Sequence, residues 1–260
     1  MNQLDFGFGA LEAEFWRLVF VMTRIGAAVV AAPLFGTAAV PPQVRVMVAG
    51  AIAVMVCAWT PVAAPANLFS VQGLVIVAGE VLVGLPMGFV LQLAFTAPVI
   101  AAEIIGGGMG MSMATAVDPN SGTQSPALGQ YFAVVVTLMF LALGAHLQWL
   151  ALVVESYRVF PPGATWLGAE KFAQVPAFAS TTFATAVMIA LPVSLILLVV
   201  QMVTGIVSRS APALNLFALG LPAGVLAGIA ALIVSAPVLT DQVSELIAAG
   251  VGAASDLLAP

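Results

Sequence analysis

The chain has 260 residues, of which 62% are hydrophobic and 7% are charged, and its formal net charge is −5. Soluble domains carry about 25% charged residues, whereas the mean hydropathy here is +1.17. These values indicate an integral membrane protein and argue against a soluble enzyme or a disordered chain. No basic cluster supplies the phosphate-neutralising surface of a nucleic-acid binder. Cys57, the single cysteine, permits neither an intramolecular disulfide nor a cysteine-based zinc site.

The N-terminal residues do not resemble a secretory signal, which opens with positive charge before a short apolar core. Asp5, Glu12 and Glu14 all precede the first positive residue, Arg17. Apolar residues from Leu11 onward recur at helical spacing, which predicts a helix along the membrane interface. A frayed polar tail is the alternative interpretation of residues 1–9.

Long charge-free runs separated by turn residues predict about six membrane-spanning helices, since one span needs about 20 apolar residues. The predicted segments are residues 15–35, 44–60, 71–102, 126–154, 177–207 and 212–239, followed by a short amphipathic helix at 241–258. Ser125-Pro126 offers an N-cap and a first-turn proline for the fourth segment. The short break at residues 209–212 predicts that the last two segments form an antiparallel hairpin.

The basic residues leave the membrane orientation open. With alternating segments, Arg45 and Arg209 would lie on one side, and Arg17, Arg158 and Lys171 on the other. The positive-inside rule needs a clearer bias than this. A chain with so little topological charge is either held in place by partners or not arranged as a simple bundle.

Proline and glycine are dense inside the apolar runs. Internal prolines remove a helix hydrogen bond and kink the axis, while small residues let helices approach closely. The internal prolines are Pro33, Pro86, Pro98, Pro192, Pro222 and Pro237. Membrane helices tolerate both residue types in general, which is the alternative explanation. Gly-Leu-Pro-x-Gly occurs at 84–88 and again at 220–224, a weak sign of an internal repeat.

One apolar stretch, at residues 106–113, combines glycine with methionine. It consists of Gly106, Gly107, Gly108, Met109, Gly110, Met111, Ser112 and Met113. Each glycine disfavours a helix by about 1 kcal/mol relative to alanine, and non-helical backbone at membrane depth survives only inside protein or along a cavity. Flexible methionines suit a constriction that opens and reseals. The alternative is a plain surface loop, and the turn sequence Asp118-Pro119-Asn120-Ser121-Gly122 follows.

Four polar residues lie within or beside the apolar segments: Arg24, Glu80, Glu103 and His146. A charge at the centre of a membrane helix costs about 2.5–3.5 kcal/mol, so such residues normally face a partner or water. Arg24 is expected to pair with Glu80 or Glu103, within the chain or across a subunit contact. An assembly role is favoured over a proton pathway, because no chain of titratable groups is present. The lone His146 is interpreted as a hydrogen-bonded helix contact.

Motifs of enzymatic sites are absent from the sequence. It contains no Gly-x-Ser-x-Gly, no phosphate-binding Gly-x-x-x-x-Gly-Lys and no His-Glu-x-x-His. The only lysine, Lys171, is predicted to lie in a loop. The chain is therefore expected to be no enzyme and to carry no catalytic site, cofactor or metal.

Several blocks of sequence occur in an order typical of one membrane-protein family. They are Pro33-Leu34-Phe35-Gly36 with Val40-Pro41-Pro42-Gln43-Val44-Arg45; Glu80 with Gly84, Gly88 and Gln92; Ala102-Glu103-Ile104-Ile105-Gly106 with Met109-Gly110, residues 118–122 and Gln124-Ser125-Pro126; Gly144-Ala145-His146; and Phe160-Pro161-Pro162-Gly163. On these blocks the chain resembles the FliR family of flagellar export-gate components, called SctT in virulence type III secretion. Met113 and Ala116 stand where the family often has bulkier, aromatic residues.

The resemblance implies an all-α membrane protein of long kinked helices, resembling a fusion of a FliP-like and a FliQ-like part. It implies a single domain over 1–260, with N-terminal helices and a plug loop in 1–125 and C-terminal helices in 126–260. The expected partners are FliP and FliQ in the gate, FlhB at its cytoplasmic entrance, membrane lipid and unfolded secreted proteins. The expected location is the bacterial inner membrane, within the flagellar basal body.

The resemblance also maps the family's plug loop onto residues 106–122. The candidate plug residues are Gly106, Gly107, Gly108, Met109, Gly110, Met111, Ser112, Met113, Asp118, Pro119 and Gly122. Three alternatives remain: a virulence-system gate subunit, a small-solute transporter with a midplane site between broken helices, and a structural scaffold with an inert loop.

Overall fold

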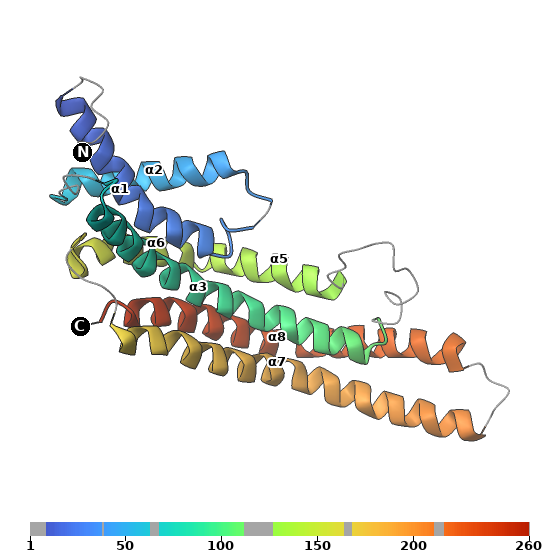
Figure 1. Cartoon of the computed structure of the whole chain (residues 1–260). Coiled ribbons are helices and arrows are strands. Elements are labelled where there is room, and N and C mark those ends of the chain that lie inside the picture. Colours follow the sequence, from blue (N-terminus) through green and yellow to red (C-terminus); the bar gives the residue numbers. More distant parts are fainter. Residues whose placement is uncertain are drawn as a thin grey trace. The chain divides into compact units, whose positions relative to one another are not determined.

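The computed structural model describes residues 9–37, 39–62, 68–111, 127–163, 168–210 and 216–259, and within these ranges all regular structure is α-helix (Figure 1). The helices are α1 Ala10–Ala31, α2 Pro42–Trp59, α3 Val71–Gly108, α5 Ala127–Ala142, α6 Ala145–Val159, α7 Ala169–Ser210 and α8 Leu216–Asp256. Two compact units result. Unit 1 consists of Met1–Leu93, Gly144–Ala179 and Ala248–Pro260, and unit 2 of Ala94–Leu143 and Ser180–Ile247.

Four of the described helices are long and apolar enough to cross a membrane. They are α2, α3, α7 and, from Gly220 onward, α8; α5 and α6 add a fifth span if they are counted as one broken helix. This composition fits an integral membrane protein, but the expectation of six spans is not confirmed. Helix α1 is long enough to cross a membrane but too charged, because Glu12, Glu14, Arg17 and Arg24 lie within its 22 residues.

The predicted breaks between segments are wrong in two places. The segment predicted at 126–154 is interrupted, because α5 ends at Ala142 and Gly144 adopts a left-handed φ of 68° that favours glycine. The segment at 212–239 and the amphipathic helix at 241–258 are instead one helix, α8. The change from apolar to amphipathic pattern near Thr240 alters which faces are apolar, but it does not interrupt the backbone hydrogen bonds.

In unit 1, α1 and α3 approach closely at two glycines. A Cβ atom at Gly84 would overlap the carbonyl oxygen of Arg24, and one at Gly88 would overlap the carbonyl oxygen of Ala28. Small residues four positions apart allow this kind of backbone contact between helices. Phe20 and Ile25 of α1 are buried in the same unit.

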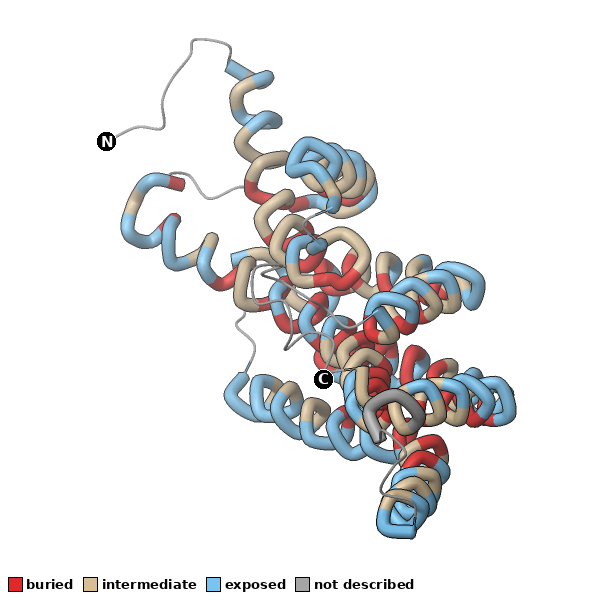
Figure 2. The backbone as a smooth tube through the Cα atoms, turned by 90° about the vertical axis from the view of Figure 1, so that its right-hand side faces the viewer, coloured by how far each residue is buried: buried red, intermediate tan, exposed pale blue. Residues whose placement is uncertain are grey.

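In unit 2, α7 buries one stripe and exposes the opposite face. The buried residues of this stripe recur at helical spacing and are Thr182, Ala186, Ile189, Ala190, Val193 and Leu197. Large apolar side chains such as Val199 and Ile206 are exposed on the same helix, and Figure 2 shows extended exposed stretches along the helices. Exposed apolar faces of this size require lipid or protein to cover them.

The substitution Gly84→Ala tests the close contact between α1 and α3. We expect it to destabilise the chain by about 1–3 kcal/mol, because the added methyl group meets backbone that cannot rotate away. The matched control is Gly26→Ala on α1, where nothing lies within 4 Å of the added atom. That control should be neutral or slightly stabilising, since alanine favours a helix by about 1 kcal/mol over glycine. Equal thermal unfolding midpoints for the two variants in detergent would contradict the contact.

Candidate functional site

A buried ion pair joins α1 to α3 in unit 1. Arg24 Nε donates a hydrogen bond to Glu80 Oε2 at 2.8 Å, and the two side chains are only 1% and 4% exposed. The sequence prediction left the partner of Arg24 open between Glu80 and Glu103, and the partner in the structure is Glu80. A buried pair tolerates this environment only when its remaining donors and acceptors are also satisfied.

The rest of the Arg24 guanidinium caps the C-terminal end of α6. Its Nη1 donates to the carbonyl oxygen of Ser156 at 2.7 Å, and its Nη2 donates to that of Phe160 at 2.9 Å. A cation is favourable at this position, because the carbonyls at the end of a helix carry partial negative charge. The Ser156 carbonyl also accepts a hydrogen bond from the Phe160 N–H at 2.9 Å. The Arg24 Cζ atom also lies 4.3 Å from the centre of the Tyr157 ring, within the range of a cation–π contact.

Glu80 extends the same cluster to the turn that follows α6. Its Oε1 accepts a hydrogen bond from the backbone N–H of Gly163 at 3.2 Å. Gly163 has a φ of 79°, which favours glycine. The Arg24–Glu80 cluster therefore connects α1, α3, the end of α6 and its following turn through hydrogen bonds, which is the geometry of a structural joint.

Other basic side chains in unit 1 also cap helix ends. Arg17 Nη2 donates to the carbonyl oxygens of Cys57 at 2.7 Å and Thr60 at 3.1 Å, where α2 ends. Lys171 Nζ donates to the carbonyl oxygen of Asp256 at 3.1 Å, at the end of α8. Placing Lys171 in a loop is wrong, because it lies in the first turn of α7.

Sequence reasoning did not identify several members of these contacts. Ser156 and Tyr157 were not singled out, and Gly163 was noted only within a block without a role. Trp149 Nε1 donates to the Met87 carbonyl oxygen at 2.9 Å, a contact for which no sequence signal exists. Tyr157 could have been suspected, because a buried phenol normally needs a hydrogen-bond partner. Its hydroxyl donates to the carbonyl oxygen of Val21 at 2.6 Å.

The remaining polar candidates are distributed elsewhere. Glu103 is exposed on the part of α3 that belongs to unit 2. His146 lies in the first turn of α6 and is partly buried. Neither residue contributes to the ion pair of Arg24 with Glu80.

The glycine-rich stretch of the predicted plug is helical at its start. Residues 106–108 form the last turn of α3, so the expectation of non-helical backbone is wrong there. The helix ends in a Schellman motif: Met111 N–H donates to the Gly106 carbonyl and Gly110 N–H to the Gly107 carbonyl, both at 3.0 Å. Gly110 adopts the left-handed φ of 80° that this motif requires. These bonds offset the low helix propensity of the glycines.

The rest of the predicted plug lies outside the described residues. This applies to Ser112, Met113, Asp118, Pro119 and Gly122. Within the described part of the stretch, Met109 is 3% exposed.

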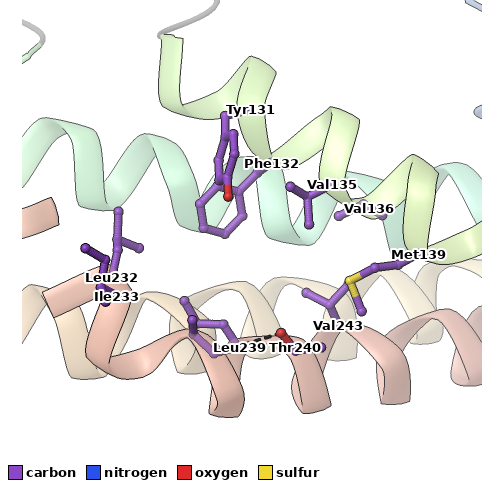
Figure 3. A pocket seen from close by; sticks show the side chains of 11 residues that line it. Tyr131, Phe132, Val135, Val136, Met139, Leu232, Ile233, Leu239, Thr240 and Val243 are labelled. Atoms are coloured by element: carbon purple, nitrogen blue, oxygen red, sulfur yellow. Dashed lines mark hydrogen bonds between the residues drawn. The ribbon is translucent and has the colours of Figure 1, made fainter. Parts of the chain in front are cut away.

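Unit 2 also contains an apolar pocket between α5 and α8, with a volume of about 200 Å³. Figure 3 shows Tyr131 and Phe132 of α5 on one side and Leu239 and Val243 of α8 on the other. None of the described residues that line this pocket carries a charge. A polar solute would therefore find few groups there to fix its orientation.

Comparison with known proteins identifies the family. The model of the family described as "Bacterial export proteins, family 1" matches residues 15–250. The chain is 31% identical to the flagellar biosynthetic protein FliR of Escherichia coli (strain K12), over 91% of this chain and 88% of that protein. It is 32% identical to the Bacillus subtilis (strain 168) protein of the same name, over 94% of this chain and 95% of that protein. The chain belongs to the FliR family.

Membership in the FliR family indicates a component of the flagellar export apparatus, which implies a multi-protein complex. The apolar helices agree with a membrane location for such a component.

Removing either partner of the buried ion pair should reduce the amount of folded chain. We expect Arg24→Ala or Glu80→Ala to cost about 3–5 kcal/mol, because an uncompensated buried charge or its unpaired hydrogen-bond partners would remain. The measurement is the yield of chain in the membrane and in the assembled export complex.

The matched control is Glu14→Ala, which breaks an ion pair of 3.3 Å with Arg17 in which Glu14 is 68% exposed. An exposed pair contributes about 1 kcal/mol or less, so this variant should accumulate normally. Normal yields of Arg24→Ala and Glu80→Ala, combined with lost secretion, would instead support a proton-coupling role.

Proposed function

We propose that this chain helps to form and plug the flagellar type III export gate, through which unfolded flagellar proteins cross the bacterial inner membrane. The observation that carries the proposal is the match to the export-protein family over residues 15–250. In this proposal the chain acts within the basal body, in a hetero-oligomer with FliP and FliQ, and FlhB lies at the cytoplasmic entrance. The whole chain, 1–260, acts as one FliR-like domain combining FliP-like and FliQ-like architecture.

The length of α3 supports the proposal that protein partners cover part of this helix. Helix α3 has 38 residues, and its exposed apolar side chains run from Val71 to Ile104, about 50 Å at 1.5 Å per residue. A hydrocarbon layer of about 30 Å covers about 39 Å of a helix even at a tilt of 40°. The remaining apolar surface needs cover from protein rather than water, which suits a helix embedded in a larger assembly.

The plug is proposed for residues 106–122, where a glycine-rich helix end leads out of apolar surroundings. Methionine side chains are unbranched and adaptable, so they can pack against one another and separate again as a chain passes. This residue chemistry favours a seal over an inert surface loop. Because the named relatives are flagellar proteins, the flagellar apparatus is favoured over a virulence system.

A small-solute transporter is the less favoured alternative. Such a protein would need polar groups around a midplane site. The pocket between α5 and α8 is apolar, and the Arg24–Glu80 cluster directs its hydrogen bonds to backbone groups of the chain itself.

Replacing the loop tests the plug. We expect residues 112–122, exchanged for a glycine–serine linker of equal length, to leave complex assembly intact and to make the membrane leak ions, because the seal loses its side chains. The measurement is membrane conductance in cells that also express the gate partners. The control is a linker of the same kind at residues 164–167, between α6 and α7. An unchanged conductance in assembled complexes with the replaced 112–122 segment would rule out the plug.

A further inference from the structure

Two side chains of α7 hold the end of α3 in unit 2. Gln201 of α7 donates a hydrogen bond from Nε2 to the carbonyl oxygen of Gly108 at 2.8 Å. The Leu197 side chain also packs closely on Gly108, where an added Cβ would lie 3.1 Å from its Cδ1. The Schellman motif already satisfies the carbonyls of Gly106 and Gly107. The last turn of α3 therefore has few unpaired backbone groups and little room to move.

Met109, the next residue, packs into a gap on α8. The gap is formed by Gly224 and Gly228, four positions apart on one helix face, and is called here the glycine notch. A Cβ on Gly228 would overlap the Cγ, Sδ and Cε atoms of Met109, and a Cβ on Gly224 would lie 3.2 Å from the Met109 carbonyl oxygen. The absence of side chains at both positions creates the space that the methionine fills.

The contact of Met109 with the glycine notch is buried and closely packed. Met109 is 3% exposed, and its backbone N–H donates to the Ile105 carbonyl at 2.9 Å, continuing the helical hydrogen bonds of α3. Withdrawing a side chain from a closely packed site is unfavourable, because its apolar atoms lose their burial and a cavity is left behind. Displacing it during each opening of a gate would be costly.

We propose that Met109 is a positioning residue: seated in the glycine notch, it anchors the end of α3 to α8, and it stays seated during export. This inference rests on the proposed plug function and refines it. The anchor consists of the described end of the methionine stretch, up to Met111.

Substitutions at Met109 test the anchor in cells that express the complete gate. We expect Met109→Ala to raise the resting ion conductance by roughly tenfold, because losing the buried side chain shifts the balance between seated and unseated forms by at least one decade. Met109→Leu keeps the volume and should restore most of the low conductance. Two variants are compared in the same assay. If the 112–122 replacement leaks ions but Met109→Ala has the wild-type conductance, the anchor is overturned and the plug stays intact.

Filling the notch tests the partner surface. Gly228→Leu should displace Met109 and raise the conductance, and combining it with Met109→Ala should reverse part of that rise, since the new leucine occupies the vacated space. The matched control is Gly220→Leu on the same helix, where nothing lies within 4 Å of an added Cβ. It should behave as wild type. Conductance in the double variant equal to or above that of Gly228→Leu would contradict the contact.

A disulfide between the Met109 and Gly228 positions tests whether Met109 must leave the glycine notch during export. Met109→Cys and Gly228→Cys, with Cys57→Ser to remove the native thiol, should crosslink readily, because the Met109 Cγ position lies 2.6 Å from a Cβ at 228. We expect the oxidised protein to secrete at the level of the reduced protein. Loss of secretion that a reductant restores would show that Met109 must leave the notch, and would overturn the anchor. Failure to crosslink would overturn the contact itself. Neither readout depends on the plug being correct, because crosslinking is scored by gel mobility and secretion by export of protein.

Discussion

The carbonyl groups at helix ends set the main constraint on this fold. Each helix leaves four backbone acceptors without intrahelical partners, and an apolar chain in a membrane has little water to satisfy them. Arg24 meets this need at the end of α6, as Arg17 does for α2 and Lys171 for α8. Three of the six basic residues, Arg17, Arg24 and Lys171, thus bind carbonyl groups at helix ends.

Glycine performs the complementary task of bringing helices together. Gly84 and Gly88 admit the backbone of α1, and Gly224 and Gly228 admit Met109. Both glycines of the first Gly-Leu-Pro-x-Gly sequence lie in a close contact, whereas in the second only Gly224 does, because nothing lies within 4 Å of a Cβ added at Gly220. The two sequences therefore do not play equivalent packing roles.

The sequence predicted the class of fold well and its interruptions less well. Charge-free runs identified apolar helices such as α2 and α7, because length and hydropathy are local properties. The break at Gly144 was missed, since a left-handed glycine leaves no distinct signal in a glycine-rich chain. The helical state of Gly106–Gly108 was also missed, because packing against Leu197 and the Schellman bonds outweigh their weak propensity. Of the polar candidates, Arg24 and Glu80 were paired correctly as one option, whereas their backbone partners on α6 depend on tertiary contacts.

The most direct test of the export role is secretion in a strain that lacks this gene. The culture medium of the deletion strain, and of the same strain carrying the gene on a plasmid, is assayed for flagellar hook and filament proteins. If the chain is a flagellar export-gate component, both proteins should disappear from the medium on deletion and return on complementation. Continued secretion of hook and filament proteins without the gene would contradict it.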